Sequence, residues 1–168
     1  MGVRAYINQN LWIGYVAGIA GILLALASLW YSETSASRAA NALTQAWFSD
    51  DDGATWFADS QWMIPPFDHN GKMADRAYIY SCNGAKSPFC AFLSRFTPAA
   101  KKALDDAHQA ARDGKAPPPA GLYERLASTS LEFKKPGQST WVNIQDPRVA
   151  LVRKIDCPPG SNVQAVLP

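Results

Sequence analysis

The residues that could do acid–base chemistry lie in two short stretches of the chain. Three consecutive acids, Asp50–Asp52, precede a glycine, and Asp68-His69 follows in a later loop. A histidine beside a carboxylate is a pair that general acid–base catalysis uses, and loops often carry catalytic groups. No spacing ties these groups to a nucleophile, however, so a polar turn is the simpler interpretation of Asp68-His69-Asn70.

Metal, cofactor and nucleic-acid sites are not indicated by the remaining polar residues. The acidic run lacks the spacing and the distal glutamate of an EF-hand loop. His108 has no second histidine or cysteine three or four residues away on its predicted helix. The net charge is +2 over 168 residues, which leaves no basic surplus for nucleic acid. We therefore predict no catalytic residues, no metal, no cofactor and no nucleic-acid partner.

Three cysteines, Cys82, Cys90 and Cys157, allow three single pairings, and none belongs to a CxxC motif. In an oxidising compartment one bridge and one spare thiol is the simple outcome, whereas a cytosolic domain would keep all three reduced. A Cys82–Cys157 bridge closes a long loop worth about 4 kcal/mol in the chain-entropy model, against about 2–3 kcal/mol for Cys82–Cys90. We favour Cys82–Cys157.

Two aromatic pairs flank the acidic run, in the sequence WFSDDDGATWF. Asp52-Gly53 between apolar runs predicts a hairpin, because glycine accepts the positive φ of a tight turn. The motif positions are Ser49, Asp51, Gly53, Thr55 and Trp56. They resemble the Asp-box of sialidase-like β-propellers, which implies hydrogen bonds within the turn and a tryptophan packed beneath it. The motif occurs once in a chain too short for propeller blades, so the resemblance implies the hairpin and not a hydrolase.

The other elements predict a small, mainly antiparallel sheet with one packed helix. A helix over 99–113 should begin after Thr97 as N-cap and end at Gly114. Strands are expected over 77–82, 89–96, 130–133, 140–144 and 153–157, with a helical turn ending at 152, while 122–126 is ambiguous. The fold class is thus an α+β domain over 47–160 and a loose tail over 161–168.

An uncharged stretch, Leu11–Tyr31, precedes this domain. As a helix it would span roughly 30 Å, the thickness of a bilayer's hydrocarbon core. Trp12 lies near one end and Trp30 near the other, where aromatic rings meet lipid headgroups. We predict an uncleaved transmembrane helix over 11–31, a cytoplasmic tail over 1–10 and a helical stalk over 32–46; the alternative is a buried helix of a soluble protein.

A slight charge bias and the cysteines place the C-terminal domain in a periplasm-like space, and hence the protein in the inner membrane as a single-pass chain. Small residues recur on one side of the predicted helix at Gly14, Gly18, Gly21, Ala25 and Ser28. Such a stripe lets another membrane helix approach closely, although glycine and alanine are common in membrane helices anyway.

A wider resemblance runs from Trp47 to Cys157, through DDGATWFAD, a Pro-Pro-Phe-Asp loop, DRAYIYSC, FLSRFTPAAKKAL and a late KKPG. It is similar to an uncharacterised family of small single-pass membrane proteins of planctomycete-type bacteria. The resemblance implies an anchored small domain and no particular reaction.

These features favour a non-catalytic, membrane-anchored accessory or structural subunit, with other membrane protein subunits and the lipid bilayer as its partners. Aromatic residues at Trp47, Trp56, Trp62 and Phe67 would form a docking patch if exposed and a core if buried. The alternatives are a pilin-like subunit, for which the leader and an early helix glutamate are missing, and an anchored enzyme or binding module.

Overall fold

The computed structural model describes residues 19, 21–24, 28, 44–84 and 86–168. The chain divides into two compact units, Met1–Leu43 and Thr44–Pro168. The described residues of the first unit are helical. Every element discussed below belongs to the second unit.

The predicted transmembrane helix requires a correction. A membrane-spanning helix needs about 20 consecutive apolar residues. The longest helical run described within 11–31 is 21–24, and no described helix is long and apolar enough to cross a membrane. The transmembrane part of the predicted fold class and the inner-membrane, single-pass location are therefore wrong. The tail over 1–10, most of the stalk, and the stripe positions Gly14, Gly18 and Ala25 lie outside the described residues.

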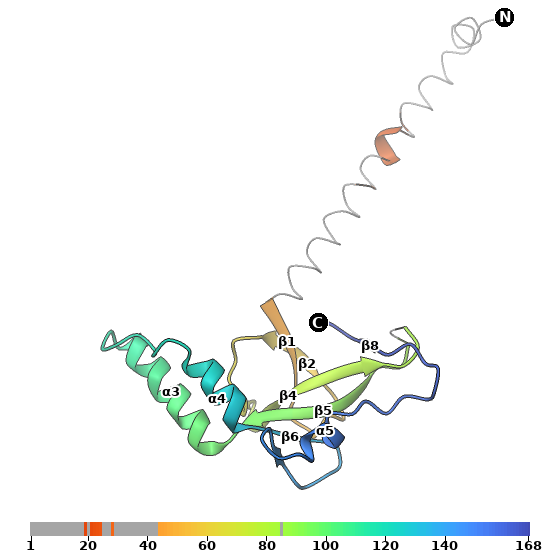
Figure 1. Cartoon of the computed structure of the whole chain (residues 1–168). Helices are drawn as coiled ribbons and strands as arrows, with labels where there is room; N and C mark the ends of the chain where they lie inside the picture. Colours follow the sequence, from red (N-terminus) through yellow and green to blue (C-terminus); the bar gives the residue numbers. More distant parts are fainter. Residues whose placement is uncertain (1–18, 20, 25–27, 29–43, 85) are drawn as a thin grey trace, which may run out of the picture. The chain divides into compact units, whose positions relative to one another are not determined.

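The second unit is a small antiparallel sheet with a few helices (Figure 1). Its strands are β1 (Gln45–Ser49), β2 (Phe57–Ser60), β3 (Phe67–His69), β4 (Lys72–Ser81), β5 (Phe89–Phe96), β6 (Leu131–Lys134), β7 (Val142–Asn143) and β8 (Gln164–Ala165). The main path runs β2-β1-β4-β5-β6-β7, and both β3 and β8 pair with β4. The β1–β2 hairpin forms as predicted, with Asp52 and Gly53 at φ 63° and 82°.

Strand β4 is the centre of the sheet because it pairs with four others. Its first residues pair with β3, its middle with β1 and β5, and its last residues with β8. The strand expected over 77–82 is therefore only its second half. The first half, Lys72–Arg76, was missed because it is mostly polar, and its one fully buried residue is the small Ala74.

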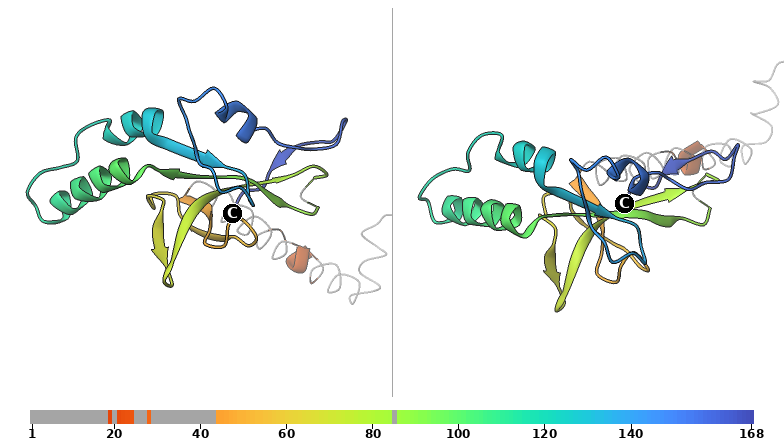
Figure 2. Two further views of the ribbon diagram at one scale, coloured as in Figure 1. Left: turned by 90° about the horizontal axis from the view of Figure 1, so that it is seen from below. Right: turned by 60° about the horizontal axis from the view of Figure 1, so that its bottom comes forward.

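Three helices accompany the sheet: α3 (Pro98–Arg112), α4 (Leu122–Ser130) and α5 (Val149–Val152). The hydroxyl of Thr97 accepts a hydrogen bond from the Ala100 amide at 3.4 Å, so α3 begins where its capping residues predict. Helices α3 and α4 lie side by side beyond one end of the sheet in both views of Figure 2. They pack on Phe96 and Ile64 through Leu104.

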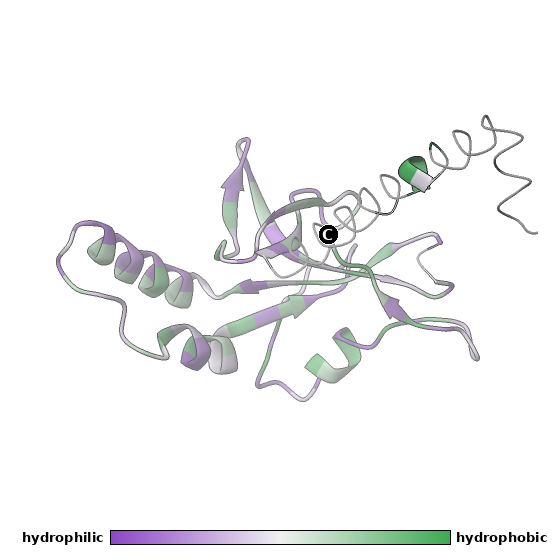
Figure 3. Ribbon diagram, turned by 90° about the horizontal axis from the view of Figure 1, so that it is seen from above, coloured by the Kyte–Doolittle hydropathy of each residue, from purple (hydrophilic) through white to green (hydrophobic). Residues whose placement is uncertain are grey.

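Both faces of the sheet carry apolar side chains, because neighbouring residues of a strand point to opposite faces. On β5, Phe92 packs with Phe133 and Val152, whereas Leu93 packs with Ala77 and three half-buried tryptophans. Helix α5 is hydrophobic along its whole length in Figure 3. Its Val152 is buried in the first cluster, while Leu151 stays 70% exposed.

The C-terminal end differs from the expectation. Residues 153–157 form no strand, and the short strand β8 lies instead within the supposed loose tail. The Val166 amide donates to the Ile79 carbonyl at 2.9 Å, and the Trp47 indole donates to the Val166 carbonyl at 2.8 Å. These contacts hold the chain end against β4. The first strand also begins earlier than expected, since Gln45 and Ala46, assigned to the stalk, belong to β1.

Candidate functional site

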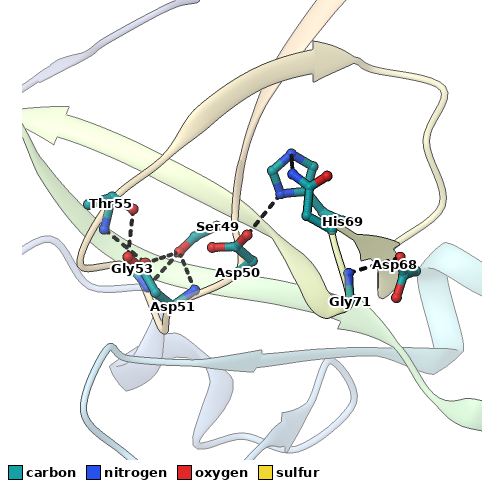
Figure 4. Close-up of polar contacts among 9 residues, drawn as sticks. Ser49, Asp50, Asp51, Gly53, Thr55, Asp68, His69 and Gly71 are labelled. Atoms are coloured by element: carbon teal, nitrogen blue, oxygen red, sulfur yellow. Dashed lines mark hydrogen bonds and ion pairs between the residues drawn. The ribbon is translucent and has the colours of Figure 1, made fainter.

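The acidic turn between β1 and β2 is held together by its own side chains (Figure 4). The Asp51 carboxylate accepts hydrogen bonds from the Thr55 amide at 2.9 Å and from the Thr55 hydroxyl at 2.5 Å. The Ser49 hydroxyl donates to Asp51 at 2.9 Å and accepts from the Gly53 amide at 2.8 Å. Because the Thr55 bonds stabilise its charged form, the pKa of Asp51 is lowered. Asp51 therefore serves the turn.

The neighbouring acid, Asp52, joins this turn to the end of β6 and to the loop that follows it. Its carboxylate lies 2.7 Å from the Lys134 ammonium and accepts a hydrogen bond from the Gly137 amide at 2.9 Å. A Cβ on Gly53 would come within 3.0 Å of both the Cys90 sulfur and a Pro136 carbon. Trp56 packs against the cluster that contains Leu93.

The third acid, Asp50, meets His69, which lies 19 residues further along the chain. Nδ1 of His69 is 2.8 Å from Oδ2 of Asp50, and the imidazole stacks on the Phe57 ring at 3.9 Å between centroids. The second ring nitrogen, Nε2, contacts the Asn70 amide group at 3.3 Å. An amide is not a nucleophile, so the contact is a carboxylate–imidazole pair without the third member of a triad.

The cysteines form the predicted bridge. Cys82 and Cys157 are joined by a disulfide with their Cα atoms 5.6 Å apart, which confirms the favoured pairing. Cys90 is free and half-buried, and burial raises its pKa to about 11. Its thiol is therefore protonated at neutral pH, which is unlike a catalytic cysteine.

A half-buried carboxyl that the sequence analysis missed lies at Asp75 in β4. Its Oδ1 is buried and has no hydrogen-bond partner among the described residues. Burial raises the pKa of Asp75 to about 6, against the opposing effect of Arg95 and Lys134. Asp75 went unnoticed because it precedes the predicted start of its strand.

A hollow with a mostly apolar lining lies elsewhere, between the sheet and the helices α3 and α4. It encloses about 380 Å³. Its lining includes Trp62, Ile64, Arg76, His108, Tyr123 and Glu124. These residues come from the loop before β3, from β4, from α3 and from α4. The Tyr123 ring meets Phe96 edge-on at 5.4 Å between centroids, and burial raises the pKa of its hydroxyl.

The ionisable side chains of this cleft that could pair with one another do not do so in the described part of the chain. Over residues 44–84 and 86–168, neither Arg76, Glu124 nor His108 makes a side-chain hydrogen bond or an ion pair. Arg76 is nonetheless half-buried on the central strand. Apolar walls with a few convergent polar groups are typical of a binding site. No sequence signal pointed to this cleft, because its residues come from four separate segments.

No family model, curated protein or solved structure matches this chain. The function is therefore inferred from the geometry.

The aromatic residues that were considered as a docking patch separate into two groups. Trp47 and Trp56 are half-buried against the Leu93 cluster, and Phe67 is buried against Phe48. Trp62 alone of the four is largely exposed, at 77%, and it stands at the cleft.

Proposed function

We propose that residues 44–168 form a non-catalytic accessory domain that binds another protein through the cleft beside Trp62. The observation that carries this proposal is the 77% exposure of a tryptophan at the edge of an apolar cleft. A tryptophan in water loses the free energy that burial would supply, and tryptophan is among the residues most enriched at the energetic centres of protein interfaces.

The placement of the candidate catalytic groups supports a binding role. Asp51 and Asp52 are occupied in holding the turn, and the Cys90 thiol is half-buried with a raised pKa. The cleft differs from the acidic turn, because Arg76 and Glu124 have no partner among the described residues and are therefore available to bind another protein. The domain thus offers a recognition surface more readily than a reaction centre.

The test compares two single substitutions in the full chain, Trp62→Ala and Leu151→Ala. Both remove an exposed large apolar side chain, but Leu151 lies on α5, away from the cleft lining. Each variant would be expressed in cells that make the protein natively, isolated gently, and its stoichiometric companions quantified by mass spectrometry. We expect Trp62→Ala to lose a companion that the native chain and Leu151→Ala retain. Equal retention by both variants, or no companion with the native chain, would contradict the proposal.

A second candidate function, general-base hydrolysis, is favoured by the 2.8 Å contact between Asp50 and His69. Asp50 orients the imidazole, and Nε2 would take a proton from water once the Asn70 contact opens. This candidate requires that His69→Gln abolish turnover of an activated ester while Asn70→Ala preserves or raises it. Turnover that is equal in the native chain and His69→Gln would eliminate it.

A further inference from the structure

Arg76 differs from the other half-buried cations on the sheet. Arg95 pairs with Glu132 at 3.2 Å, and Lys134 pairs with Asp52 at 2.7 Å. Arg76 has no acidic partner anywhere in the described part of the chain. Partial burial removes water from a charged group, and this cost is recovered only when an opposite charge takes the place of the water. The unpaired guanidinium therefore favours an anion that comes from outside the chain.

The backbone holds Arg76 in a fixed position. It lies in the middle of β4, opposite Phe48 of β1 on one side and Ser94 of β5 on the other. A residue flanked by two paired strands has a fixed backbone, so the Arg76 side chain always starts from the same point of the cleft wall. A fixed attachment point lowers part of the entropy cost of capturing a ligand.

The chemistry of the cleft indicates a single carboxylate. A guanidinium forms two parallel hydrogen bonds with a planar carboxylate. A phosphate monoester carries up to two negative charges, and the unpaired Glu124 on the same cleft would repel that higher charge. The other titratable groups that line the cleft are His108 of α3 and Tyr123 of α4.

The apolar residues define what must accompany this carboxylate. Trp62, Ile64 and Tyr123 line the same cleft as Arg76, so a ligand has to present an apolar group next to its charge. The volume of about 380 Å³ lies near the lower end of the roughly 300–1,000 Å³ usual for ligand sites. The C-terminal residue of a protein meets both conditions in a small space, because its side chain and its carboxylate share one Cα atom.

Resting on the proposed protein-binding function, we infer that the cleft captures the C-terminus of a partner protein that ends in a bulky apolar residue. Arg76 pairs with the terminal carboxylate, and the apolar side chain packs against Trp62 and Tyr123. Glu124 disfavours a second acid close to the terminus, so the residues before the last one are neutral or basic.

The test uses the full chain and synthetic hexapeptides with a neutral Gly-Ser spacer that end in Leu, Ile, Phe or Trp. Each peptide carries an N-terminal dye, is made with either a free carboxylate or an amidated end, and is titrated by fluorescence polarisation. We expect the best free-acid peptide to bind about 10- to 100-fold more tightly than its amide, since a charge-assisted hydrogen bond contributes about 1.5–3 kcal/mol.

Variants then assign this difference to Arg76. Arg76→Gln should reduce binding of the free acid to the level of the amide, and Arg76→Lys should retain only part of the preference. Arg112→Gln, an exposed arginine in the last turn of α3, serves as the matched control and should bind as the native chain does. Thermal unfolding of each variant verifies that the domain is folded.

Equal binding of the free-acid and amidated peptides, or no binding of any peptide, would overturn the inference. So would an amidated peptide with an internal glutamate that binds as tightly as the free acid, because the bound anion would then be an acidic side chain. The inference can fail while the proposed function survives. If no peptide binds but a companion protein is still lost on Trp62→Ala, only the C-terminal ligand is wrong. If Trp62→Ala changes nothing, the proposed function fails as well.

Discussion

The ammonium group of Lys134 lies 2.7 Å from the carboxylate of Asp52, although 82 residues separate the two along the chain. Lys134 ends β6, while Asp52 forms the tip of the turn between β1 and β2. The lysine side chain is only 14% exposed. The pair therefore connects the acidic turn with the end of β6 through a mostly buried lysine and a carboxylate that is 41% exposed.

Replacement of Asp52 by alanine should destabilise the domain by about 1–2 kcal/mol, because it leaves Lys134 without its carboxylate and the Gly137 amide without its acceptor. The matched control is Asp106→Ala, which removes an ion pair with Lys102 that is exposed at both ends. That change should cost less than about 0.5 kcal/mol. Urea unfolding at neutral pH measures the loss of unfolding free energy in both variants. Equal losses would show that the Asp52 contact stabilises the domain no more than an exposed ion pair does.

The half-buried Asp75 predicts an unusual dependence of stability on pH. Its pKa is about 6 in the folded domain and 3.8 when unperturbed. Between these values the folded state holds a proton that the unfolded state has lost, so stability should fall as pH rises from about 4 to about 6. The loss is at most about 3 kcal/mol for this shift.

Asp75→Asn should flatten this decline, which urea midpoints measured at half-unit steps of pH would reveal. The groups around the carboxyl are Arg95 and Lys134, which favour its charged form, and Asp52, which opposes it. Asp51 provides an internal contrast, because its lowered pKa places its own loss of stability below pH 4. An unchanged slope in Asp75→Asn would show that another group titrates in this range.

The Cys82–Cys157 disulfide should contribute a large part of the stability of the domain. Its ends are 75 residues apart, and closure of such a loop is worth about 4 kcal/mol in the chain-entropy model. Cys82→Ser with Cys157→Ser should therefore lower the unfolding free energy by about that amount. Cys90→Ala is the control, since Cys90 is unbridged. A double variant as stable as Cys90→Ala would contradict the expectation.

Gly53 and Cys90 should be energetically coupled. Gly53 has φ +82°, and a Cβ there would lie 3.0 Å from the Cys90 sulfur. Gly53→Ala should destabilise the domain by about 1–3 kcal/mol, from backbone strain and from this overlap. Cys90→Ala removes the sulfur, so the double variant should be more stable than the sum of the single effects predicts. Strict additivity in urea unfolding would mean that the overlap with the Cys90 sulfur adds nothing to the cost.

Several elements were predictable because their signals are local. The β1–β2 hairpin follows from Asp52-Gly53, whose positive φ values few other residues accept, and α3 follows from Thr97 and Pro98 at its start. The Cys82–Cys157 bridge followed from the preference for a long loop. In the hairpin and the helix a few neighbouring residues determine the structure, and for the disulfide the spacing of two cysteines indicated the pairing.

The remaining features depend on contacts between distant segments. Strand β8 has two residues and exists because β4 offers them an edge, which no local pattern in 161–168 indicates. The cleft takes its apolar wall from the loop around Trp62 and its charge from Arg76, while α4 was ambiguous in the sequence. The spanning helix expected over 11–31 was inferred from apolar length and composition alone, which take no account of the rest of the structure. That expectation was wrong.

The contact between the Trp47 indole and the Val166 carbonyl has a consequence for how this unit is made. During synthesis β1 leaves the ribosome long before its partner near the end of the chain, and β4 waits for β8 in the same way. Strand pairings between residues so far apart in the sequence form slowly, because the intervening chain must first lose conformational entropy. The sheet can therefore be completed only after translation has delivered residue 166, and until then the exposed edge of β4 is a place where nascent chains can associate with one another.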